Sequence, residues 1–158
     1  MSLTAELFVD SRCELGEGPF WHPLLGRLSW FDILNNTLLS ADDNGHVVDR
    51  ITFKDTVSAA GVIDEHTLAV TQSGTLLRYD FRDDSRTPII SVEADVPGNR
   101  TNDSRVDRAG GFWIGPIGRR AEMGVGAVWH YRRGVLNQIL SGIRIPNSIC
   151  FSPDGRTA

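Results

Sequence analysis

The chain has 158 residues, enough for one domain with a buried core, and 41% of them are hydrophobic. Against 20 Asp and Glu residues stand only 16 Lys and Arg residues, and the net charge of −4 argues against the clustered basic surface that nucleic-acid binding requires. Two distant cysteines in apolar settings, Cys13 and Cys150, favour reduced, buried thiols over a disulfide framework or a zinc site.

The opening segment, residues 1–6, has no basic stretch and no long apolar run. We therefore expect neither a signal peptide nor a membrane span, and the default location is the cytoplasm.

Short apolar runs separated by Gly, Asp, Asn and Pro predict an all-β protein, because no long window keeps a helical period free of helix breakers. A first strand is expected at residues 7–9. Four strands in a meander should follow near residues 19–21, 28–31, 38–41 and 47–53. Between the last two, Asn44-Gly45 is the strongest short hairpin signal.

This four-strand pattern then repeats along the chain. A second copy runs over residues 60–92, and a third begins at Asn102 and continues to about Leu140. A fourth opens with a strand at residues 146–151 and turns at residues 152–155. A period of roughly 40 to 45 residues is typical of the four-stranded blades of a β-propeller.

In a propeller the innermost strands surround a central channel, so the residues that begin them meet at one mouth of that channel. Aligning the copies places Gly18, Gly61, Asn102 and Asn147 at like positions, with Glu17 beside the first and Arg100 near the third. Oxygen donors gathered there would suit a hard divalent cation. In the competing interpretation, Glu17 caps a turn and Asn147 bonds its own backbone.

Other sites are poorly supported. The sequence lacks a Gly-x-Ser-x-Gly nucleophile elbow, residues 42–45 lack the spacing and distal Glu of an EF-hand, and residues 124–126 have no following helix or Lys. The four histidines have no metal-type spacing, and we interpret all of them as structural: His22, His46, His66 and His130.

Four segments carry a resemblance to a known family: LGEGP at residues 15–19, RTND at 100–103, FWIG at 112–115, and IPNS at 145–148 with SPDG at 152–155. In order and spacing they resemble the SMP-30/gluconolactonase/regucalcin family. The resemblance implies a six-bladed β-propeller with one divalent metal at the channel mouth. Residues 1–158 would be a single, truncated domain of about three blades and the start of a fourth.

The same resemblance assigns roles to individual residues. It implies that Glu17 and Asn147 are metal ligands, and that Arg100, Asn102 and Glu122 contact a sugar-like substrate. Ca²⁺ is the leading candidate for the ion, while Zn²⁺, Mg²⁺ and Mn²⁺ also suit such donors. The family's third ligand, an Asp that also serves as general base, would lie beyond Ala158, so the catalytic residue is unknown.

The leading hypothesis is metal-dependent hydrolysis of a sugar lactone, with that lactone as the only expected partner. The alternative is a non-catalytic calcium-binding propeller or an inactive fragment. If the chain stands alone, we expect self-association through the open faces of its end blades.

Overall fold

The computed structural model describes residues 3–158; Met1 and Ser2, at the start of the segment expected to lack a signal peptide, lie outside the described residues. The described chain is all-β, as predicted, and forms three antiparallel sheets of four strands each. We call these sheets blades 1, 2 and 3 in chain order.

Each blade is a meander, because every strand pairs with its neighbour in sequence. Blade 1 contains β1 (Gly16–His22), β2 (Arg27–Asp32), β3 (Thr37–Ala41) and β4 (Val47–Thr52). Blade 2 contains β5 (Val57–Val62), β6 (Thr67–Gln72), β7 (Gly74–Asp80) and β8 (Ser85–Val92). Blade 3 contains β9 (Asn99–Val106), β10 (Phe112–Gly118), β11 (Gly126–Arg132) and β12 (Val135–Ile143).

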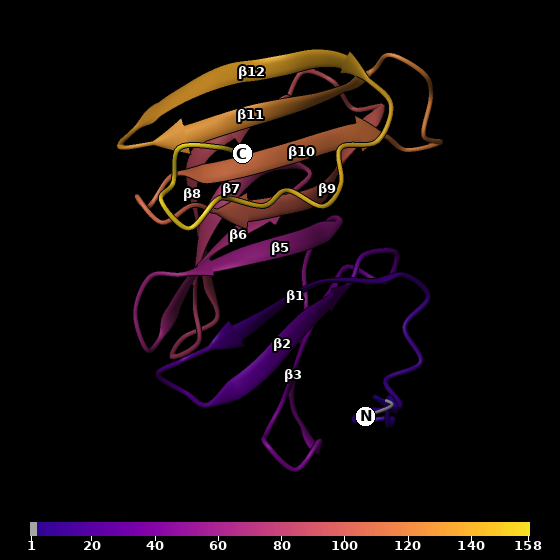
Figure 1. The fold of residues 1–158 in the computed structure, drawn as a ribbon, viewed down its shortest axis with the longest axis vertical. Helices are drawn as coiled ribbons and strands as arrows, with labels where there is room; N and C mark the ends of the chain where they lie inside the picture. Colours follow the sequence, from indigo (N-terminus) through magenta and orange to yellow (C-terminus); the bar gives the residue numbers. More distant parts are fainter. Residues whose placement is uncertain (1–2) are drawn as a thin grey trace.

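The first strands of the three blades lie side by side, with β5 between β1 and β9 (Figure 1). Their arrows point the same way, so the residues that begin them gather at one end of the molecule. The expected hairpin between β3 and β4 is also present: Gly45 adopts φ of 79°, and its N–H donates to the carbonyl of Asp42.

Apolar side chains fill the spaces between blades. Between blades 1 and 2 the core is large and aromatic, and its buried members are Phe31, Ile33, Leu38, Phe53, Val57, Leu68, Val70, Leu77 and Tyr79. Between blades 2 and 3 it is smaller, with buried members Ala59, Leu76, Val92, Phe112 and Ile114.

Two predicted strands are wrong. Residues 7–9 form no strand, and neither do residues 146–151, because no neighbouring strand pairs with either segment within residues 3–158. The first segment instead lies against the turn at Gly45, and the second packs across blade 3 (Figure 1).

One expected thiol environment is also wrong. Both cysteines are free, but Cys150 is exposed, because the segment that carries it lies on the surface of blade 3. Over residues 3–158 the structure has no helix long and apolar enough to cross a membrane.

Candidate functional site

Each inner strand carries a β-bulge close to its beginning. In β1 the bulge lies between Glu17 and Phe20, and in β5 it lies between Val57 and Ala59. In β9 the bulge lies between Thr101 and Ser104, which pair with Pro116 and Ile114 of β10. A bulge bends a strand and redirects its side chains, so these three segments are shaped alike at the mouth.

The bulges correct one alignment made from the sequence. When Val57 is aligned with Glu17, the residue in blade 2 that corresponds to Gly18 is Ser58, not Gly61. Gly61 lies three residues further along β5 and packs against Val106. The extra residue of a bulge shifts the alignment without leaving a clear mark in the sequence.

The bulge residues Gly18, Ser58 and Asn102 contact one another in succession from blade 1 to blade 3. Gly18, with φ of 58°, approaches blade 2 so closely that a Cβ there would lie 2.0 Å from the carbonyl oxygen of Ser58. The hydroxyl of Ser58 donates to the carbonyl of Asn102, at 2.5 Å. Asn102 Nδ2 donates in turn to the carbonyl of Pro146, at 3.1 Å. Through β5, these contacts link the three segments that carry Glu17, Asn102 and Asn147.

Glu17 in β1 and Arg100 in β9 are charged residues that the inner strands bring to the mouth. Glu17 is half-buried, and its carboxylate makes no hydrogen bond within residues 3–158. Burial, and next the positive charge of Arg119, hold the pKa of Arg100 below its ordinary value, while the charge of Glu17 acts in the opposite direction. Glu17 and Arg100 come from inner strands whose first residues gather at the same end of the molecule.

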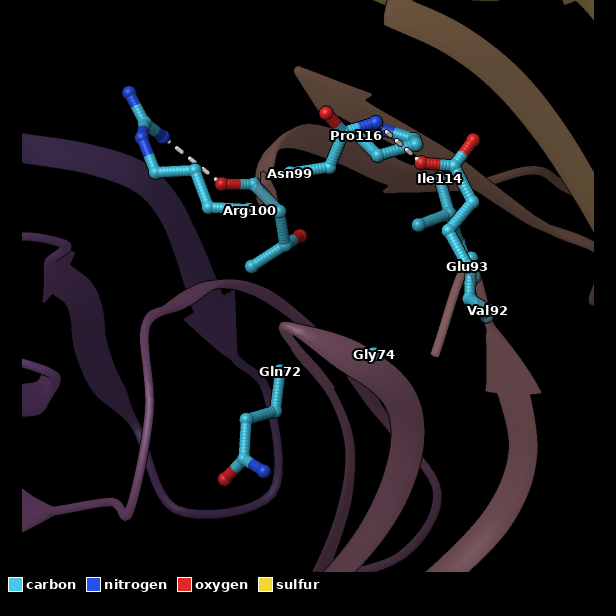
Figure 2. Close-up of a pocket in the computed structure, with 9 residues that line it drawn as sticks. Gln72, Gly74, Val92, Glu93, Asn99, Arg100, Ile114 and Pro116 are labelled. Carbon is cyan, nitrogen blue, oxygen red and sulfur yellow. Dashed lines mark hydrogen bonds between the residues drawn. The ribbon is translucent and has the colours of Figure 1, made fainter. Parts of the chain in front are cut away.

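The guanidinium of Arg100 is held by its own strand. Its Nη1 donates to the carbonyl of Thr101 at 2.9 Å and to Oδ1 of Asn102 at 3.0 Å. Figure 2 shows Arg100 extending from β9 with its bond to the main chain. The Nε and Nη2 groups have no hydrogen-bond partner within residues 3–158, so they remain able to donate to a ligand.

Asn102 is buried, with 7% of its surface exposed, and both ends of its amide are bonded within the protein. Asn147 is exposed, and its Oδ1 accepts from the N–H of Ser148 at 2.8 Å, which is the backbone bond of the competing interpretation. An amide oxygen has two lone pairs, so one remains for another partner.

The segment that carries Asn147 is tied to blade 3. The N–H of Ile149 donates to Oδ2 of Asp103 at 2.8 Å. Gly115 makes room for the segment, since a Cβ there would lie 3.0 Å from the ring of Pro146. These contacts bring Asn147 to the side of β9 on which Asn102 lies.

Glu122 lies in the exposed loop between β10 and β11, where its Oε2 accepts from the N–H of Arg120 at 3.1 Å. Sequence reasoning missed the residues that anchor this loop. Arg119 binds both carboxylate oxygens of Asp55, which lies just before β5, at 3.1 and 3.2 Å, and also the carbonyl of Pro97. The sequence signals for this ion pair were an acidic residue just before β5 and a basic residue just after β10.

A hollow between blades 2 and 3 lies next to this mouth, and Arg100 is at its edge (Figure 2). The carboxylate of Glu93 is bonded there to Asn99 Nδ2 and to Trp129 Nε1, each at 2.8 Å. Because each of its oxygens accepts a hydrogen bond, Glu93 joins the end of blade 2 to blade 3.

The donor set is compatible with a hard cation. Residues 3–158 contain no group of three or more His, Cys, Asp and Glu side chains placed to hold a metal. Glu17 nevertheless offers a carboxylate without a hydrogen bond, and Asn147 offers an amide oxygen with a free lone pair. Carboxylate and amide oxygens are the ligands that Ca²⁺ prefers.

Consecutive four-stranded blades, with polar residues at the shared mouth, define an arc of a β-propeller. A family model described as the SMP-30/Gluconolactonase/LRE-like region matches residues 15–158. The chain belongs to this family.

The relatives include proteins named as lactonases and as regucalcins. The chain is 36% identical over 151 residues to a protein of Rhizobium meliloti named as a sugar lactone lactonase, which covers 94% of this chain and 50% of that protein. It is 26% identical over 135 residues to human regucalcin, which covers 85% of this chain and 44% of that protein. The chain thus spans half or less of the length of these relatives.

Solved structures agree with the fold. A calcium-binding protein, regucalcin, from Agrobacterium tumefaciens matches with a TM-score of 0.87 and 36% identity, over 90% of this chain and 48% of that one. A gluconolactonase from Xanthomonas campestris matches with a TM-score of 0.74 at 21% identity, over 91% of this chain and 53% of that one. The second likeness concerns the fold alone.

Proposed function

We propose that the protein containing this chain is a six-bladed propeller that hydrolyses a sugar lactone with the help of one divalent cation. The observation that carries the proposal is the set of polar atoms left without a hydrogen bond on the inner strands that meet at the mouth. Glu17 of β1 offers a half-buried carboxylate, and Arg100 of β9 offers a guanidinium with free donors. The 36% identity to a protein named as a sugar lactone lactonase supports the same activity.

Glu17 and Asn147 would hold the ion, with Ca²⁺ as the first candidate. A divalent ion there supplies polarisation of the lactone carbonyl and a lowered pKa for a bound water. By family resemblance, the third ligand would be an Asp of a later blade, which would also serve as the general base.

The remaining residues bind and orient the sugar. The free Nε and Nη2 groups of Arg100 form a planar fork that suits two neighbouring hydroxyls. Asn102 orients that fork, because its Oδ1 accepts from Nη1. Glu122 is exposed in the adjoining loop, where its carboxylate can accept a hydrogen bond from a hydroxyl.

The test is the substitution Glu17→Gln in the full-length protein, which removes one charge at nearly constant volume. We expect divalent-ion affinity to fall and lactone hydrolysis to be lost, with the β-sheet circular dichroism unchanged. Calorimetry with Ca²⁺ and Mn²⁺ measures the affinity. Unchanged affinity in the variant would remove Glu17 from the ion's ligands.

The second candidate function is calcium binding without turnover. It is favoured by the similarity to a calcium-binding regucalcin at 36% identity. A panel of five- and six-membered sugar lactones, assayed with several divalent ions, separates the two functions. Ion binding without hydrolysis of any lactone would support the second. A cytoplasmic location remains a prediction of the sequence.

A further inference from the structure

We infer that Ser58 is a positioning residue for this site, acting through the main chain of Asn102 on the direction of Arg100. The inference rests on the proposed function, because it concerns how the same mouth grips a polyhydroxylated lactone. Ser58 lies in β5 of blade 2 and is 1% exposed, so no ligand reaches it directly.

The β9 bulge makes this contact necessary. The register between β9 and β10 shifts between residues 101 and 104, so the ladder does not pair residue 102 with β10. Two serine hydroxyls bond the carbonyl of Asn102 instead: Ser58 at 2.5 Å and Ser104 at 3.2 Å. Only Ser58 comes from another blade, and it therefore fixes this carbonyl relative to blade 2.

The direction of the bond is set by its acceptor, because the carbonyl of Asn102 can only accept. A serine hydroxyl has one proton, and that of Ser58 is donated to Asn102. Thr101 Oγ1, at 2.7 Å, must therefore donate to Ser58. Thr71 Oγ1, at 3.2 Å from Ser58, donates its own proton to the carbonyl of Ala59. The network leaves Ser58 as the donor toward blade 3.

The same two residues that Ser58 holds are the ones that hold Arg100. Nη1 of Arg100 donates to the carbonyl of Thr101 and to the side chain of Asn102. A shift of residues 101 and 102 therefore moves both acceptors of the guanidinium together. Misplacing a binding group by about 1 Å from its productive geometry lowers catalysis up to about 100-fold.

The experiment compares Ser58→Ala with a matched control, Ser40→Ala, in the full-length protein. Ser40 is 2% exposed in β3 and shares a buried hydrogen bond of 2.9 Å with Ser29 of β2, within blade 1. Both variants lose one buried hydroxyl, so both should lower Tm. A purely structural role predicts that the two variants behave alike in catalysis.

We expect Ser58→Ala to lower kcat/KM for glucono-1,5-lactone about tenfold, and for unsubstituted δ-valerolactone less than about twofold. Ca²⁺ affinity should stay within about twofold of the parent value, because the contact of Ser58 with Gly18 uses the main chain. Ser40→Ala should leave all three quantities unchanged. Equal behaviour of the two variants, or equal losses of Ser58→Ala on both lactones, would overturn the inference.

A binding assay tests the role of Ser58 independently of whether the protein hydrolyses a lactone. A polyhydroxylated lactam, in which an amide replaces the ester, is titrated calorimetrically into the same variants. If the parent protein binds the lactam but hydrolyses no lactone, the proposed function fails, and weaker lactam binding by Ser58→Ala alone still supports the inference. If the parent protein neither binds the lactam nor hydrolyses a lactone, both proposals fail.

Discussion

The two interfaces between blades differ in chemistry. Blades 1 and 2 meet through a large apolar core that includes Phe31, Phe53 and Tyr79. Blades 2 and 3 meet through a smaller apolar core, and next to it lies a set of buried hydroxyls around Ser58 and Thr101. Apolar contacts are non-directional, whereas hydroxyl bonds depend on geometry. The interface between blades 1 and 2 therefore mainly stabilises the fold, and the interface between blades 2 and 3 orients the side chains at the mouth.

The largest effect should come from emptying the apolar interface. Phe31 is fully buried, so Phe31→Ala should cost about 3–5 kcal/mol of unfolding free energy. Urea denaturation measures the loss. The control is Trp21→Ala in the same blade, where the side chain is 54% exposed and the cost should be below that of Phe31→Ala. Equal costs for the two would contradict the assignment of the core.

The close contact between blades 1 and 2 at the mouth can be tested by substituting two glycines of similar backbone conformation. Gly18 and Gly26 have φ of 58° and 60°, but a Cβ at Gly26 would meet nothing within 4 Å. Gly26→Ala should cost only the strain of the left-handed region, about 1 kcal/mol. Gly18→Ala adds a clash with the main chain of Ser58 and should cost about 2–3 kcal/mol. Thermal unfolding of the two variants measures the difference.

A buried carboxylate makes the entry to blade 1 sensitive to pH. Asp32 is 4% exposed; burial acts to raise its pKa, but hydrogen bonds from Asn35, Leu15 and Glu14 outweigh burial and hold the pKa below its ordinary value. Because the folded pKa is the lower one, the stabilisation is present above the unfolded pKa of about 4 and is lost as pH falls through the folded pKa.

Asp32→Asn should therefore cost about 1–2 kcal/mol at pH 7, and the cost should shrink as the pH falls below about 4. Urea denaturation at a series of pH values gives the two curves. Parallel curves for the parent protein and the variant would show that Asp32 does not contribute in this way.

The smallest effect belongs to the ion pair that anchors the Glu122 loop. The side chains of Asp55 and Arg119 are 43% and 41% exposed, so solvent screens the pair and Asp55→Asn should cost less than about 1 kcal/mol. Its effect should appear instead as a raised KM for sugar lactones. Asp84→Asn, which removes a comparable surface pair with Arg86, should leave KM unchanged.

The repeated strands were predictable because turn residues mark them. Asn44-Gly45 and similar segments interrupt the apolar runs at regular spacing, and the three blades follow that spacing. The prediction of a strand at residues 7–9 was wrong because composition alone could not show that the strand lacks a partner. Its apolar residues match a strand, but a strand also needs a partner edge, which composition does not reveal.

The site was only partly predictable for the same kind of reason. Glu17, Arg100 and Asn102 stand out as polar residues before apolar strands, and the structure brings their segments together. Ser58 does not stand out, because a serine in a strand is ordinary. Its role depends on the bulge in β9 and on packing between blades, which are tertiary features.

The meander order of the strands has a consequence for synthesis of the chain. Every ladder joins neighbours in sequence, so a blade of roughly 40 residues needs no later segment to form its hydrogen bonds. A ribosome takes several seconds to add that length, at about 5–20 residues per second, whereas a hairpin forms in about 1–10 μs. Each blade can therefore complete its ladders before the next emerges. Until blade 2 follows, however, the apolar face of blade 1 around Phe31 is open to water and to other nascent chains.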